Sequence, residues 1–157
     1  MRRTALLLAT GMFTGLAVAC GGDDDPTQPE QATEFVAALT STASTDASGT
    51  ATFEVPSSSV SFRIEVQSLE GATVARIHIG ADGPAVLTLF SNSAGVDVAG
   101  GVLAEGTITA EHIVQGTSLT LAQVAQLISS ENAFLNITTI AHPQGEIRGQ
   151  IVAEEEG

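Results

Sequence analysis

The side chains best suited to metal or acid–base chemistry are three histidines, His78, His112 and His142. Imidazole is a common ligand of zinc and copper, but a tight site needs several donors held together. His78 alternates with Arg76 in an apolar run, so both are expected on one outward face of a strand, where the arginine would repel a metal ion. We therefore predict no metal site and no cofactor, and His78 is the only candidate ligand.

The other two histidines lie in segments that favour turns. His112 follows Thr109-Ala-Glu, a short turn before an expected helix, and we expect it at the surface. His142 precedes Pro143, whose ring restricts the residue before it to turn or extended conformations. We therefore interpret His142 as a turn residue.

No constellation typical of an enzyme is found in the sequence. Serines are plentiful, but none lies in the Gly-x-Ser-x-Gly elbow of serine hydrolases. Cys20 is the only cysteine, so the rest of the chain has no thiol nucleophile and no intrachain disulfide can form. No glycine-rich phosphate loop follows a strand. We predict that the protein has no catalytic residues and is not an enzyme.

Glu146 and Arg148 lie on either side of Ile147, so the alternation of a strand predicts that both face solvent. They are either a recognition pair or a structural pair, in which the charges bind each other or Arg148 reaches loop carbonyls. We favour the structural interpretation, because an exposed ion pair contributes little energy whereas the forked donors of arginine can hold loops. Gly145 fits a turn, and Gly149 is expected on the inward face, where it allows an opposing sheet to approach.

Short runs of alternating apolar and polar residues predict the strands that carry these side chains. The clearest run places Val60, Phe62, Ile64 and Val66 on one face. Further runs cover residues 35–39, 51–55, 72–79, 85–90 and 103–109, and a hairpin over 132–151 completes about eight strands. A turn over 80–84 and a glycine-rich loop over 91–101 separate some of them. The pattern favours an all-β fold, an antiparallel Greek-key-like β-sandwich.

One short helix is expected between the strands. Its apolar stripe consists of Leu121, Val124, Ala125 and Ile128. Thr120 can cap its start, with Gln123 at the reciprocal position of a capping box. A one-sided stripe on a short helix usually covers a core, so we expect the helix to close one open end of the sandwich.

The composition is strongly acidic. Five arginines and no lysine face 18 Asp and Glu, a formal net charge of -13. Such a surface repels phosphate backbones and anionic headgroups, which excludes nucleic acid as an expected partner. The chain has no Trp or Tyr, so aromatic-rich recognition of sugars or single strands is not expected either.

The N-terminal residues predict secretion and lipidation. Residues 1–19 combine a basic start with an apolar stretch too short for a transmembrane helix, which is typical of a signal peptide. Leu16-Ala-Val-Ala-Cys20 resembles a bacterial lipobox, which would make Cys20 the lipidated, palmitate-bearing first residue and the membrane anchor.

The composition also divides the rest of the chain. Residues 20–32 contain no apolar core residue and predict a disordered acidic tether, because such a segment cannot bury enough surface to offset its ordering entropy. The folded domain is expected over 33–153, and residues 154–157 form an acidic tail.

Two stretches resemble signatures of the CHRD domain, a module first named from chordin. Residues 75–86, Ala-Arg-Ile-His-Ile-Gly-Ala-Asp-Gly-Pro-Ala-Val, resemble one signature, and residues 143–149, Pro-Gln-Gly-Glu-Ile-Arg-Gly, resemble another. Within these two stretches the matched positions are His78, Gly80, Gly83, Pro84, Pro143, Gly145, Glu146, Arg148 and Gly149. Asn136 matches through residues 135–139, Leu-Asn-Ile-Thr-Thr, where the family commonly has Val-Asn-Val-His-Thr. The resemblance covers residues 35–152 and implies a Greek-key sandwich, superoxide-dismutase-like or immunoglobulin-like in outline.

The resemblance also identifies two departures from the family pattern. The family usually has histidines at two positions that are Arg76 and Thr138 here. Imidazoles at all three places would form a set of metal ligands, but this chain keeps only His78.

We therefore expect a lipid-anchored CHRD domain of the cell envelope that acts as a non-catalytic binding or structural module. It would lie on the outer side of the cytoplasmic membrane or in the outer membrane, with an envelope or extracellular protein or polymer as partner. Two alternatives stay open: a superoxide-dismutase-like metal-binding protein that uses His78, and an extracellular adhesion or matrix component.

Overall fold

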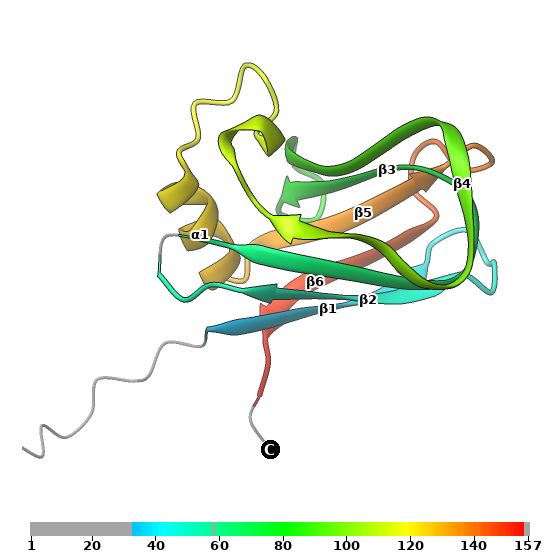
Figure 1. Ribbon diagram of the computed structural model, residues 1–157, viewed down its shortest axis with the longest axis horizontal. Coiled ribbons are helices and arrows are strands. Elements are labelled where there is room, and N and C mark those ends of the chain that lie inside the picture. The colour runs from blue at the N-terminus through cyan, green and yellow to red at the C-terminus, as the bar shows by residue number, and fades with distance from the viewer. Residues whose placement is uncertain (1–32, 58, 156–157) are drawn as a thin grey trace, which may run out of the picture. The chain divides into compact units, whose positions relative to one another are not determined.

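Figure 1 shows the computed structural model, which describes residues 33–57 and 59–155. Within these residues the elements are β1 (Glu34–Ser41), β2 (Ser48–Glu54), β3 (Ser61–Ile79), β4 (Ala85–Thr107), the 3-10 helix η1 (Ala110–His112), α1 (Leu121–Ser129), β5 (Ala133–Thr139) and β6 (Ile147–Ala153). The predicted all-β class with one short α-helix is confirmed. The expected signal peptide, Cys20 and the tether lie outside the described residues.

The strands of the described chain form one antiparallel 6-stranded sheet in the order β2-β1-β6-β5-β3-β4. β2 also pairs with β3, which closes β2, β1, β6, β5 and β3 into a five-stranded barrel. β4 pairs with the other edge of β3. The expected sandwich of about eight strands is thus corrected to a sheet of 6 strands that closes on itself.

The difference in strand number has a local cause, because two strands are longer than the sequence predicts. β3 continues through 67–71 for a length of 19 residues, and β4 continues through the expected loop at 91–101 for 23 residues. The two strands pair with each other along both segments, so the backbone donors and acceptors there are satisfied within the sheet. Glycine-rich composition alone therefore gave the wrong prediction for 91–101.

Instead of ending, β3 bends sharply near its middle. Ser68 and Gly71 have positive φ angles of 53° and 64°, and the pairing with β4 shifts register between Leu69 and Ala72. Across the bend, Gly95 has a φ of 77°, and a Cβ there would lie 3.1 Å from the Cα of Gly71. This bend lets the first half of β3 pair with β2 and the second half with β5.

The core fills the barrel with the alternating inward residues of its strands. The larger fully buried side chains include Phe53, Ile64, Ile77, Leu135 and Ile147. The outward positions between them remain exposed or half-buried, as the period of two predicts. The assignment of Ile77 to the core and Arg76 to the outer face is confirmed.

Helix α1 lies at one end of the strands in Figure 1 and contributes Val124, Ala125 and Ile128 to the same core. The capping box of Thr120 is confirmed, since its side chain accepts a hydrogen bond from the Gln123 amide. Leu121 departs from the expected stripe, because it lies in the first turn and stays 37% exposed. In the described part of the chain, no helix is long and apolar enough to cross a membrane.

Candidate functional site

The first signature stretch forms the end of β3 and the turn into β4. His78 is half-buried on the outer face of β3, and its Nδ1 lies 3.0 Å from the carbonyl oxygen of Gly83. Gly80 has a φ of 67°, and a Cβ at Gly83 would collide with the carbonyl of Ile79. The Ile79 amide donates to the carbonyl of Pro84 at 3.2 Å. These signature positions shape a tight turn, and one nitrogen of His78 is engaged in it.

The second signature stretch forms the turn between β5 and β6. The side chain of Asn136 donates from Nδ2 to the carbonyl oxygen of Gln144 at 3.2 Å. Gly145 has a φ of 132° and lies so close to Asn136 that a Cβ would collide with its amide. His142 belongs to this turn, as predicted, and its backbone amide donates to the Thr139 hydroxyl at 3.1 Å.

The prediction that Glu146 faces solvent is wrong, because the residue is buried and only 5% exposed. Its carboxylate accepts hydrogen bonds from the hydroxyls of Thr45 at 2.9 Å and Thr139 at 2.7 Å. The unusual backbone at Gly145 precedes two consecutive buried residues, Glu146 and Ile147, so strict alternation begins only inside β6. Glu146 therefore ties the loop after β1 to the turn before β6, and it does not pair with Arg148 on the surface.

Gly149 also differs from the expectation. A Cβ at this position would collide with the carbonyl oxygen of Ala38 and lie 3.3 Å from Leu39 Cδ2. Both residues belong to β1, which is the neighbour of β6 in the same sheet. The missing side chain thus allows close contact between adjacent strands of the barrel, and not the approach of a separate sheet.

The signature residues Arg148 and His78 both lie beside Phe134 on the outer side of the sheet. Arg148 places its guanidinium carbon 5.2 Å from the ring centroid of Phe134, a cation–π geometry. Phe134 pairs in register with His78 of β3. The Nε of Arg148 is buried and has no hydrogen-bond partner among the described residues.

The strand register aligns these side chains in two rows across β3, β5 and β6, which lie side by side in Figure 1. One row is Arg76, Asn136 and Arg148, and its neighbour contains His78 and Phe134. Directly opposed residues of antiparallel strands share a face. We call these five outward residues the arginine face; Arg76 is exposed and the others are half-buried.

The strand segments that carry the arginine face contain no acidic residue. Residues 72–79, 133–139 and 147–153 contain no Asp or Glu, although the chain has 18 of them. Among the described residues, the salt bridges all involve Arg63, on the first half of β3. Two guanidinium groups therefore remain without a carboxylate in the part of the chain that the structure describes.

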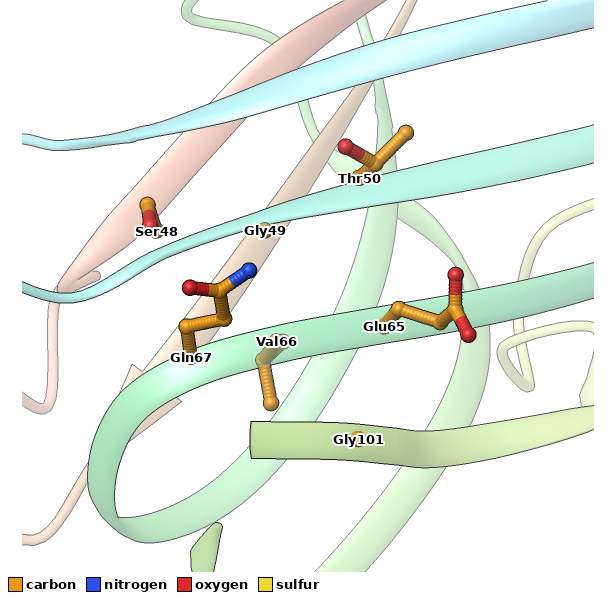
Figure 2. Close-up of a pocket in the computed structure, with 7 residues that line it drawn as sticks. All are labelled: Ser48, Gly49, Thr50, Glu65, Val66, Gln67 and Gly101. Carbon is orange, nitrogen blue, oxygen red and sulfur yellow. The ribbon is translucent and has the colours of Figure 1, made fainter. Parts of the chain in front are cut away.

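A second region of interest is a hollow of about 310 Å³ on the outside of β2, β3 and β4, which we call the polar groove (Figure 2). It is lined by Ser48, Gly49 and Thr50 of β2, Glu65, Val66 and Gln67 of β3, and Gly101 of β4. A Cβ at Gly49 would lie 2.5 Å from the carbonyl oxygen of Glu65, so only glycine fits between the strands there. The groove is large enough for a small ligand, but its one charged side chain is already bound.

That bound side chain is Glu65, which accepts hydrogen bonds from the neighbouring Arg63 at 3.1 Å and 3.3 Å. Arg63 also donates to Glu105 of β4 at 2.6 Å. The hydrogen bond to Glu65 is the main reason that the pKa of Arg63 is raised above its usual value, and the charges of Glu65 and Glu105 act in the same direction. The cation beside the polar groove is therefore neutralised by its own sheet.

A third, shallow hollow of about 460 Å³ lies between the β5–β6 turn and the loop after β1. Its lining includes Thr42, Pro143 and His142, the one titratable group there. His112 lies elsewhere, half-buried in η1 with its ring 6.0 Å from that of Phe62, whereas we expected it at the surface. The structure thus keeps the three histidines apart on three different turns or strands.

The histidines and acidic side chains do not gather into a metal site in the part of the chain that the structure describes. Over residues 33–57 and 59–155, no group of three or more His, Cys, Asp or Glu is arranged to hold a metal ion. His78 instead neighbours Arg76 on one strand and Phe134 across the sheet. The arginine face offers two permanently charged guanidinium groups and an amide donor, which suit an anion.

The sequence pattern does not identify Phe134 as a site residue, and it marks Asn136 only as a signature position. Neither residue has a local signal, because each becomes part of the site only through its neighbours on β3 and β6. Arg76 was interpreted only as a lost histidine. Its alternation with His78 does predict the outward face, but not the arginine two strands away.

Comparison with known proteins agrees with the signature residues. The family model of the CHRD domain matches residues 31–151. No curated protein and no solved structure matches the chain. The match covers nearly all of the described residues, including β1 to β5 and most of β6. The chain therefore belongs to the CHRD domain family.

Proposed function

We propose that the protein is a lipid-anchored module of the cell envelope that binds a partner through the arginine face and catalyses no reaction. The observation that carries the proposal is the pair Arg76 and Arg148, which have no carboxylate partner among the described residues of an acidic chain. An unpaired guanidinium on a sheet surface is a ready recognition group, because its donors are fixed in a planar fork.

Three signature residues support the choice of this surface. His78, Asn136 and Arg148 come from two distant stretches of sequence and meet on one side of the sheet. Among the remaining signature residues, Glu146 is buried, and Gly83, Gly145 and Gly149 leave no room for a side chain, so these four hold turns and strands in place. This division is typical of a scaffold that presents a binding surface.

The anchor and the location rest on the sequence. The basic start and short apolar stretch of residues 1–19, followed by Cys20, favour export and lipid attachment on the outer side of the cytoplasmic membrane or in the outer membrane. Residues 20–32 would then separate the barrel from the lipid. An adhesion or matrix role would use the same arrangement, with an extracellular partner.

The superoxide-dismutase-like alternative has weaker support. His78 would need further ligands, and its outward neighbours are Arg76 and Phe134. Its Nδ1 already faces the carbonyl of Gly83, which leaves Nε2 as the one free nitrogen.

Site-specific photo-crosslinking in intact cells tests the contact surface. A photoreactive residue at Gln150, exposed on β6 beside the arginine face, is expected to crosslink to an envelope component. The matched control is Gln67, an exposed glutamine on the first half of β3 beside the polar groove. Equal crosslinking from both positions, or none from Gln150, would contradict the proposal.

The anchor has its own test. Cys20→Ser is expected to move the protein from the membrane fraction to the soluble fraction, because the acylated thiol is lost. Retention of the variant in the membrane fraction would show that lipidation at Cys20 is not what holds the protein there.

A further inference from the structure

Resting on the proposed function, we propose that the row Arg76, Asn136 and Arg148 binds a carboxylate group on an otherwise uncharged ligand. The three side chains are opposed in register on β3, β5 and β6. Neighbouring strands are about 5 Å apart, so the backbone of Asn136 lies between the backbones of two arginines that are about 10 Å apart. The length of an arginine side chain allows both guanidinium groups to reach an anion placed over Asn136.

The orientation of Asn136 is fixed by the turn beside it. One N–H of its Nδ2 donates to the carbonyl of Gln144, and Gly145 packs against the amide group. The amide nitrogen carries two N–H donors, so one remains for a ligand oxygen. The central donor of the row is therefore held in position before any ligand binds, which lowers the entropic cost of binding.

Arg148 is also partly organised in advance. Its guanidinium lies over the ring of Phe134, and its Nε is shielded from water without a hydrogen-bond partner among the described residues. A partly desolvated cation attracts an anion more strongly than a fully hydrated one, because the local dielectric is lower. No hydrogen bond from Arg148 or Arg76 to the described chain competes with a ligand for their donors.

The net charge of -13 decides which anions are suited. A nucleic acid or a densely charged polymer would meet repulsion from the rest of the surface before reaching two arginines. The planar fork of arginine fits both carboxylate and phosphate groups. A single carboxylate carries the smaller negative charge of the two and is therefore repelled least by the acidic surface. The carboxylate could belong to a small organic acid or to a largely neutral polymer of the envelope, and both present the same group to the row.

Nuclear magnetic resonance on the protein purified from membranes in detergent tests the inference. The signals followed are the side-chain amide of Asn136 and the Nε–H of Arg148. The probes are acetate and a sparsely carboxymethylated dextran, with sodium chloride at equal ionic strength and unmodified dextran as controls. We expect saturable shifts with acetate if a free acid suffices, and tighter binding of the modified dextran if a polymer-borne carboxylate is the ligand.

The variants separate this row from ordinary surface charge. Arg76→Gln and Arg148→Gln are each expected to weaken carboxylate binding about tenfold or more, since each removes a charge-assisted hydrogen bond. Arg63→Gln is the matched control and is expected to bind as the unchanged protein does, because Arg63 is paired with Glu65 and Glu105. Arg76 is exposed, so its variant is expected to fold even if Arg148→Gln does not.

Inorganic phosphate, added at the same ionic strength, serves as a competing anion. The inference would be overturned by the absence of a saturable shift with either carboxylate probe, by equal shifts with chloride, or by tighter binding of phosphate than of acetate. Loss of binding in Arg63→Gln to the same extent would overturn it as well. The crosslinking from Gln150 is independent of ligand chemistry. A crosslink from Gln150 without carboxylate binding would therefore support the contact surface and reject the carboxylate as its ligand. Carboxylate binding without a crosslink would support the carboxylate site and reject the contact surface.

Discussion

The arginines on the two outer surfaces of the barrel differ in whether a carboxylate lies beside them. On the first half of β3, Arg63 is held by Glu65 of its own strand and Glu105 of β4. On the second half of the same strand, Arg76 faces β5 and has no carboxylate partner in the described chain. One strand thus carries a neutralised cation at one end and a free cation at the other.

Whether an arginine of this barrel is free to bind a ligand therefore depends on the residues of the neighbouring strands and not on the overall composition. The chain has 18 acidic residues, but β5 and β6 carry none of them. Exposed ion pairs such as that of Arg63 contribute little to stability, so the contrast concerns what the surface can bind more than how firmly it folds.

The largest effect is expected where the arginine face depends on close strand packing. Gly149→Ala places a Cβ against the backbone of Ala38 and is expected to lower the free energy of unfolding by about 3 kcal/mol. The matched control is Gly100→Ala in β4, where nothing lies within 4 Å of the added Cβ. Urea denaturation of both variants measures the difference. Similar stability of the two variants would contradict the close β6–β1 contact.

The next largest effect concerns the buried carboxylate before β6. Glu146→Ala removes the acceptor of the Thr45 and Thr139 hydroxyls and is expected to cost about 2 kcal/mol of stability. Glu54→Ala is the control, because its carboxylate accepts a single exposed hydrogen bond from Ser61. Urea denaturation compares the two glutamates, and an equal loss in Glu54→Ala would contradict the structural role of Glu146.

A smaller effect is expected from the contact between Arg148 and Phe134. A double-mutant cycle of Arg148→Ala and Phe134→Leu is expected to give a coupling energy of about 0.5–1 kcal/mol from the cation–π contact. Unfolding free energies of the two single variants and the double variant measure it. A coupling of zero would mean that the ring does not hold the guanidinium, and Arg148 would then be as loosely placed as an ordinary surface arginine.

The smallest effects are expected at the two ends of β3. Arg63→Ala is expected to lower stability slightly at low salt and not at all at high salt, because exposed ion pairs are screened. Arg76→Ala is expected to leave stability unchanged at both salt concentrations, since it has no acidic partner in the described chain. Thermal unfolding at two ionic strengths measures both variants. A salt-dependent loss of stability in Arg76→Ala would reveal an ion pair at Arg76 and would contradict its contrast with Arg63.

Much of the fold could be predicted because its signals are local. The alternation at 72–79 placed Ile77 inside and Arg76 outside, and Thr120 with Gln123 marked the start of α1. The turns at Gly80 and Gly145 follow from glycines with positive φ. Where these local rules compete with pairing, as in the glycine-rich part of β4, the hydrogen bonds to β3 decide the outcome.

The candidate site was less predictable, because its members belong to three strands. Glu146 was expected to face solvent with Arg148, but the backbone at Gly145 turns it toward the hydroxyls of Thr45 and Thr139. Periodicity cannot reveal such a change of direction. It requires the positions of loops that are far apart in the sequence.

The amino-acid pattern alone predicts the all-β class, the short capped helix, the CHRD signatures and the inward or outward direction of most strand residues. These features depend on contacts within a few residues, or on a period of two that every strand shares. Two features became visible only in the folded chain: the closure of the barrel through the pairing of β2 with β3, and the single row formed by Arg76, Asn136 and Arg148. Strand partners and register are set by packing between distant segments, so no local pattern contains them.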